Sequence, residues 1–210
     1  MVPALSLWLP VLLSAVFVFI VSSIIHMVLI RWHRDDYRQL PSENEILEAL
    51  RPFSIPPGDY FMPHLDNFKD RESEEYKAKL EQGPVGMLTV IPADYQLGKK
   101  LVSWFLYSIL VGLFAAYLTG RAVGPGAHYL EVFRFSGAVA FGAYSMALFQ
   151  NSIWYGRSWS STLKSVLDGF IYALVTAGTF GWLWPGHQGG LYVGGEERCG
   201  AVPDARGVAS

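Results

Sequence analysis

Two ionisable residues lie inside long apolar stretches of the chain, where a charged group is costly and usually functional. His26 lies five residues before the first Lys or Arg of the sequence, and Asp168 lies four residues after a lysine. At 1.5 Å per residue of helix, each is about 6–8 Å from the polar end of its stretch. Gln150 and Asn151 lie near the same end of a third stretch. We therefore predict an intramembrane polar cluster of His26, Asp168, Gln150 and Asn151.

A His–Asp pair at the mouth of a helix bundle can relay protons, bind a polar substrate head group, or hold the edge of a quinone or haem. The competing interpretation is structural. Asp168 can pair with Lys164 one helical turn away, and His26 can bond a neighbouring backbone carbonyl. Because charged groups one turn from a helix end reach water at low cost, the structural interpretation is favoured.

The sequence predicts no catalytic residue and no metal site, and it assigns no residue to a cofactor, whose presence stays open. His33 with the two aspartates at positions 35 and 36, and His64 with Asp66, offer nitrogen and oxygen ligands at short spacing. Neither set is completed by a second histidine motif, and catalytic zinc requires three ordered ligands. Haem held by two intramembrane histidines needs a second chain, because His26 is the only histidine in an apolar stretch. The single cysteine, Cys199, excludes an internal disulfide.

These residues are positioned by four apolar runs, each long enough to cross a membrane, which takes roughly 20 residues. The chain is 51% hydrophobic and only 16% charged, whereas soluble domains carry about 25% charged residues. No Lys or Arg precedes the first run, which is also too long for a cleaved signal peptide, so we predict a retained helix. The runs are Leu5–Ile30, Leu101–Gly120, Phe133–Ile153 and Leu163–Trp184.

The distribution of Lys and Arg orients the predicted helices. Twelve of the sixteen basic residues fall in residues 31–100 or in the loop before the fourth run. Basic loops stay on the cytoplasmic side, so both termini are expected outside. The predicted fold is an all-α membrane protein with a cytoplasmic segment between the first two transmembrane helices. Its parts are the first helix (1–30), the cytoplasmic segment (31–100), a three-helix region (101–185) and a disordered tail (186–210).

Small residues recur at four-residue spacing in three of the runs. Because apolar burial gives little drive for association in lipid, close backbone approach through such residues matters more. We expect them to pack the bundle internally, with an interface to another protein as the alternative. The stripes are Ser108, Gly112, Ala116 and Gly120; Ala138, Gly142, Ala143 and Ala147; and Gly169, Ala173 and Ala177, followed by Gly178 and Gly181.

The segment 31–100 is the only polar part large enough to carry a site. Ser42 and Glu45 have the spacing of a capping box before a short helix that ends ahead of Pro52. A rigid, aromatic loop follows over 55–64, then a charged helix over 68–80. Residues 85–91 favour a short strand or a membrane-surface segment. Because about 70 residues make a marginal domain, we expect the segment to dock on the helix ends.

Several short motifs lie along the chain. They are His33-Arg34-x-Asp36-Tyr37-x-x-Leu40-Pro41, Pro56-Pro57-Gly58-Asp59-Tyr60, Gly83-Pro84-Val85, Asn151-Ser152-Ile153-Trp154-Tyr155, Asp168-Gly169 and Gly181-Trp182-Leu183-Trp184-Pro185. On these motifs, over about residues 4–185, the chain resembles a group of small, uncharacterised bacterial inner-membrane proteins. The resemblance implies a bacterial inner-membrane location. It implies no activity and no site residues.

The leading functional hypothesis is a non-enzymatic accessory or scaffolding subunit of a membrane complex. Its expected partners are the lipid bilayer and either another protein or further copies of the chain, held through the small-residue faces. A net charge of −2 gives no reason to expect nucleic acid. One alternative is a small homo-oligomeric transporter or proton-coupled pore that uses His26 and Asp168. Another is a membrane enzyme or redox subunit acting on lipid or quinone.

Overall fold

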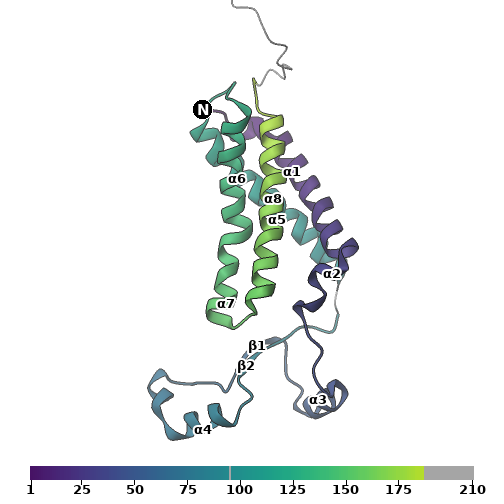
Figure 1. Ribbon diagram of the computed structural model, residues 1–210, viewed down its shortest axis with the longest axis vertical. Helices are drawn as coiled ribbons and strands as arrows, with labels where there is room; N and C mark the ends of the chain where they lie inside the picture. Colours follow the sequence, from purple (N-terminus) through teal and green to yellow (C-terminus); the bar gives the residue numbers. More distant parts are fainter. Residues whose placement is uncertain (95, 187–210) are drawn as a thin grey trace, which may run out of the picture.

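The computed structural model describes residues 1–94 and 96–186, and its four long helices form a bundle in the upper part of Figure 1. Each of the four is long and apolar enough to cross a membrane. The spans are Ala4–Val28, Leu97–Ala122, Tyr129–Tyr155 and Trp159–Trp182. All four predicted helices are therefore confirmed, with ends shifted by a few residues. The predicted disordered tail lies outside the described residues, apart from Gly186.

Two of the spans contain more than one kind of helix, and the other two are single α-helices. The first combines a 3-10 turn (Ala4–Leu7), α1 (Trp8–Ser23) and a π-helical turn (Ile24–Val28). The second and fourth are single α-helices, α5 (Leu97–Ala122) and α8 (Trp159–Trp182). The third combines α6 (Tyr129–Ser145), a 3-10 turn (Met146–Leu148) and α7 (Phe149–Tyr155).

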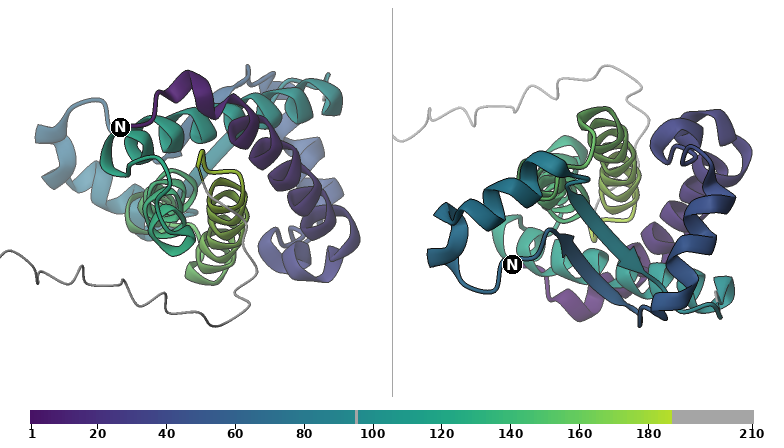
Figure 2. Two further views of the ribbon diagram at one scale, coloured as in Figure 1. Left: turned by 90° about the horizontal axis from the view of Figure 1, so that it is seen from above. Right: turned by 90° about the horizontal axis from the view of Figure 1, so that it is seen from below.

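The core of the bundle lies along the contacts among α1, α5, α6 and α8, and α6 packs most extensively on α8, as Figure 2 also shows. Its two apolar clusters lie at different levels. The cluster nearer the N-terminus includes Leu7, Val11, Ala116, Val132 and Phe180. The cluster nearer the opposite end includes Val18, Val111, Ala140, Tyr144 and Tyr172.

The small-residue stripes of α5 and α8 face this core. All four members of the α5 stripe are buried, and so are the first three of the α8 stripe. The α6 stripe behaves differently: Ala138, Gly142 and Ala147 are exposed, and α6 instead buries Ser136 and Ala140. Internal packing is thus confirmed for α5 and α8 and wrong for α6, because the spacing of small residues gives the period of a face but not which of two faces a neighbour covers.

The remaining polar segment is partly β-structure, which corrects the all-α prediction. Strands β1 and β2 pair antiparallel, with Gly58 opposite Val90 and Met62 opposite Gly86. Of the two predictions for residues 85–91, the short strand is confirmed by β2. Strand β1 lies within residues 55–64, for which the sequence predicts a loop. The elements are α2 (Ile30–His33), α3 (Glu43–Leu50), β1 (Gly58–Met62), α4 (Glu74–Gln82) and β2 (Gly86–Val90), with 3-10 turns at Arg34–Asp36, Arg51–Phe53 and Phe68–Glu72.

Residues 37–96, which we call the arm, extend from the end of the bundle opposite the N-terminus (Figures 1 and 2). No described residue of the arm is buried. The expected docking on the helix ends is therefore wrong beyond the first residues of the segment. The capping box is wrong as well: Ser42 has a φ of 47° and its side chain makes no capping hydrogen bond. In that left-handed conformation the residue does not have the extended backbone that an N-cap uses.

Candidate functional site

A break in the first span creates the site. The backbone widens into a π-turn over Ile24–Val28, where Leu29 donates its N–H to the carbonyl of Ile24 at 3.0 Å. Leu29 then leaves the helical conformation, and α2 resumes at Ile30. Seven residues of straight α-helix span about 10.5 Å, yet the rings of His26 and His33 stack with their centroids 4.7 Å apart. The break therefore brings together two histidines that a straight helix would separate.

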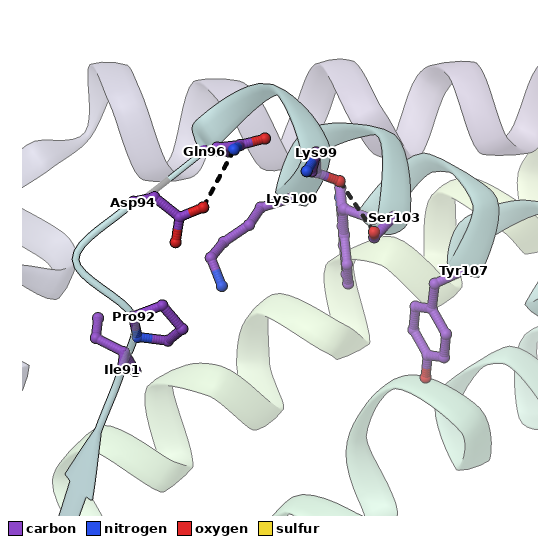
Figure 3. Close-up of a pocket in the computed structure, with 9 residues that line it drawn as sticks. Ile91, Pro92, Asp94, Gln96, Lys99, Lys100, Ser103 and Tyr107 are labelled. Atoms are coloured by element: carbon purple, nitrogen blue, oxygen red, sulfur yellow. Dashed lines mark hydrogen bonds between the residues drawn. The ribbon is translucent and has the colours of Figure 1, made fainter. Parts of the chain in front are cut away.

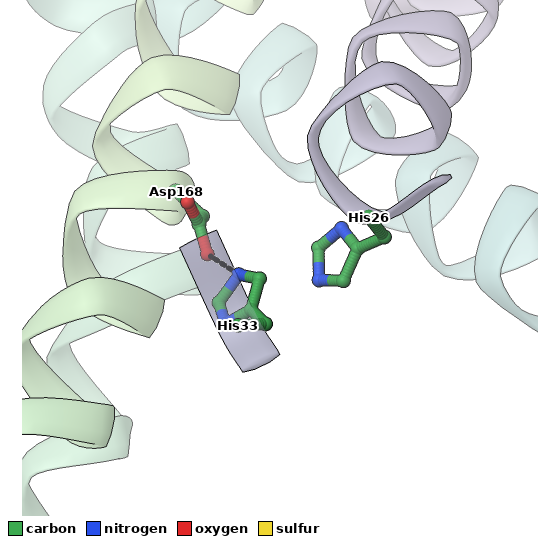
Figure 4. Close-up of side chains that lie close together, drawn as sticks. All are labelled: His26, His33 and Asp168. Atoms are coloured by element: carbon green, nitrogen blue, oxygen red, sulfur yellow. Dashed lines mark hydrogen bonds and ion pairs between the residues drawn. The ribbon is translucent and has the colours of Figure 1, made fainter. Parts of the chain in front are cut away.

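Asp168 on α8 meets this segment across the bundle (Figure 4). Asp168 is only 4% exposed. Trp32 donates its indole N–H to Oδ1 of Asp168 at 2.9 Å, and Nε2 of His33 lies 2.8 Å from Oδ2. A buried carboxylate is tolerated when such donors surround it. Asp168 is thus the point at which α8 holds the chain that leaves the first span.

A second carboxylate extends the network. Asp36 lies 2.7 Å from Nδ1 of His33 and accepts a hydrogen bond of 3.2 Å from Nζ of Lys164. A proton on each ring nitrogen lets His33 donate to both Asp36 and Asp168. Burial raises the pKa of Asp36, but hydrogen bonds from His33 and Lys164, together with their charges, outweigh burial and hold that pKa below its ordinary value of 3.8. Asp36 therefore stays ionised at neutral pH.

The ring of His26 is held by a hydrogen bond to the backbone of its own span. Its Nδ1–H donates to the carbonyl of Ser22 at 2.9 Å, and the hydroxyl of Ser22 accepts the indole N–H of Trp104 at 2.9 Å. The imidazole itself is exposed. One ligand-type atom from each of His26, His33 and Asp168 lies within 4.8 Å of the others. These three residues form what we call the His–His–Asp group.

The structure brings only part of the predicted cluster together. His26 and Asp168 meet, through His33, at the depth expected from the sequence. Gln150 is exposed and Asn151 half-buried on α7, and neither belongs to the His–His–Asp group. They lie nearer the end of the bundle than Asp168 does, because Gly169 packs against Tyr144 and Ser145 whereas Ser152 bonds Thr162. The expected common depth is therefore wrong for Gln150 and Asn151.

The sequence did not reveal three members of the hydrogen-bond network around Asp168, and it gave a fourth member, Lys164, the wrong partner. It offered His33 and Asp36 only as an incomplete set of metal ligands and did not connect them, or Trp32, with Asp168. Lys164 pairs with Asp36 rather than with Asp168, which corrects the expected pairing one turn apart. The seven-residue spacing of His26 and His33 was a usable signal, because residues two helical turns apart share a face.

A separate groove of about 650 Å³ opens where the arm joins α5 (Figure 3). Several of its polar groups already have partners. Gln96 donates to Asp94 at 3.2 Å, Ser103 donates to the carbonyl of Lys99 at 2.9 Å, and Tyr107 donates to the carbonyl of Ala143 at 2.8 Å. The groove therefore lacks the convergent polar groups typical of a ligand site. It is lined by Ile91, Pro92, Asp94, Gln96, Lys99, Lys100, Ser103, Trp104 and Tyr107.

Four apolar helices support the class of multi-pass membrane proteins. Within that class, the site is a partly buried network of acidic and basic side chains around Asp168 at one end of the bundle. Comparison of the chain with protein-family models, with curated proteins and with solved structures finds no match. Functional inference therefore rests on the residues themselves.

Proposed function

We propose that this chain is a non-enzymatic accessory or scaffolding subunit of a bacterial inner-membrane complex, and that its arm binds a cytoplasmic protein. The observation that carries the proposal is the arm itself, in which no described residue is buried. Large apolar side chains project from it, including Phe53 at 73% and Phe68 at 76% exposure. Exposed aromatic residues are enriched where proteins bind one another.

The energetics of the arm support this proposal. Each ordered residue costs about 1–2 kcal/mol of backbone entropy, which burial of apolar surface normally offsets. The paired strands and short helices of the arm provide little such burial. A partner that covers Phe53, Phe68 and their apolar neighbours supplies the missing burial of apolar surface. The network around Asp168 fits the same function, because it fixes the base of the arm on α8.

The proposal places the arm in the cytoplasm and both termini outside, as the distribution of Lys and Arg favours. The N-terminus and the described end of α8 lie at the end of the bundle opposite the arm (Figure 1). We expect a reporter that works only in the cytoplasm to be active when inserted after Asp66. A reporter that works only outside is expected to be active after Ser210. The opposite pattern from the two fusions contradicts this orientation.

The partner is tested by native mass spectrometry of the protein gently extracted from its own membrane. The wild-type chain is expected to carry a stoichiometric second protein. Replacing Phe53 and Phe68 together by serine is expected to reduce that protein at least tenfold while leaving the fold intact, because neither ring packs in a core. Glu75→Gln is the matched control, since Glu75 is an exposed arm residue that pairs only with Lys79 on the same helix.

Two outcomes contradict the proposal. One is wild-type protein that carries no stoichiometric second protein. The other is a second protein that the double serine variant retains in full. Either result moves the assignment to the transporter.

A homo-oligomeric transporter or proton-coupled pore is the second candidate. The observation in its favour is the exposed ring of His26 stacked on His33, which bonds the buried Asp168. Against it, Asp168 is the only buried Asp, Glu, Lys, Arg or His among the described residues, and the other buried polar residues are serines and threonines. A continuous proton path through one chain therefore has no support, and the accessory function is preferred.

A further inference from the structure

We propose that the His–His–Asp group binds one divalent transition-metal ion of the zinc type. Two imidazoles and a carboxylate converge from the end of the first span, α2 and α8 (Figure 4), with one ligand-type atom of each within 4.8 Å of the others. Imidazole nitrogen favours zinc, copper, iron and nickel over magnesium and calcium. This inference is independent of the proposed partner binding.

The spacing is close to that of a metal site. Ligand atoms about 2.0–2.2 Å from a tetrahedral zinc ion are about 3.4 Å from one another. The widest pair in the group therefore closes by roughly 1.4 Å, whereas His33 and Asp168, now 2.8 Å apart, separate by roughly 0.6 Å. His26 can make most of this movement, because its ring is exposed.

Each of the three side chains is oriented by a hydrogen bond through the nitrogen or oxygen atom that is not its proposed ligand atom. Nδ1 of His26 bonds the carbonyl of Ser22, and Nδ1 of His33 bonds Asp36. Oδ1 of Asp168 accepts the indole N–H of Trp32. These bonds leave Nε2 of both histidines and Oδ2 of Asp168 as the ligand atoms. Outer partners of this kind accompany metal-binding histidines and carboxylates almost always.

Binding releases one proton, and the site gains one net positive charge. The proton between Nε2 of His33 and Asp168 leaves to solvent, and each of these atoms then donates a lone pair to the ion. Three protein ligands leave a fourth position for water, as in open zinc sites. Because the ligands come from the first span, α2 and α8, a bound ion ties the base of the arm to α8 and stabilises the folded chain by mass action.

The test is zinc titration of the full chain carrying Cys199→Ser, in lipid nanodiscs after removal of metal with a chelator. We expect one Zn²⁺ ion per chain, and Co²⁺ in its place is expected to give visible ligand-field absorption. His26→Ala is expected to weaken zinc binding at least tenfold and to abolish the Co²⁺ bands. The variant should keep its fold, since His26 is exposed, and circular dichroism checks this.

The matched control is His64→Ala. His64 also lies beside an aspartate, with Nε2 3.4 Å from Asp66, but its side chain is 71% exposed and lies in the arm. This variant is expected to bind zinc as tightly as the parent chain. Absence of stoichiometric zinc in the parent chain overturns the proposal. Zinc binding that survives His26→Ala, or that is lost in His64→Ala, overturns it as well.

Discussion

Replacing Gly169 by valine is expected to lower the free energy of unfolding by about 3 kcal/mol, at the upper end of the usual cost of overpacking. A Cβ atom at this position falls against the hydroxyl of Ser145 and lies 3.0 Å from the carbonyl oxygen of Tyr144. Both neighbours belong to α6, and a backbone carbonyl cannot move without the helix. The two helices must therefore separate. Unfolding of the reconstituted protein by increasing sodium dodecyl sulfate, followed by circular dichroism, measures the loss.

Gly142→Val on α6 is the control for this prediction. No atom lies within 4 Å of a Cβ built on Gly142, so its valine variant is expected to stay within about 0.5 kcal/mol of the wild type. The two substitutions add the same side chain to spanning helices at similar depth. If both cost the same free energy, contact between α6 and α8 at Gly169 is not the cause.

Replacing Asp168 by leucine is expected to destabilise the protein by about 3 kcal/mol, the low end of the range for breaking a buried ion pair. Trp32 and His33 lose their shared acceptor, and neither finds another within the apolar bundle. Release of residues 30–36 from α8 exposes these donors to water and limits the loss. The base of the arm is thus expected to become mobile while the four helices stay assembled.

This release is measured as a distance. Spin labels at Arg34 and Ser160, both exposed, report the separation between the segment after the first span and the start of α8. A narrow distribution in the parent chain is expected to broaden in Asp168→Leu. Asp35→Leu is the control, because Asp35 is an exposed neighbour outside the network and its loss should leave the distribution unchanged. An unchanged distribution in Asp168→Leu would show that other contacts hold the segment.

The sequence alone determined the four spans and the depth of the ionisable residues within them. Crossing a membrane is a property of about 20 consecutive residues, so Ala4–Val28 and its three counterparts could be located without any tertiary contact. Depth follows from the rise per residue, which is why His26 and Asp168 lie at the expected common level. The period of the α5 stripe also follows from the sequence, although its burial does not, since the α6 stripe of the same spacing is exposed.

Only the tertiary structure decided which side of each helix faces which neighbour. Gln150 lies exposed on α7, outside the group around Asp168, because the packing of α7 on α8 sets both its rotation and its level. The pairing of β1 with β2 depends on residues about 30 positions apart, which no local pattern encodes. The π-turn before Leu29 has no glycine or proline to mark it, yet it stacks His26 on His33. The site exists because that turn meets α8.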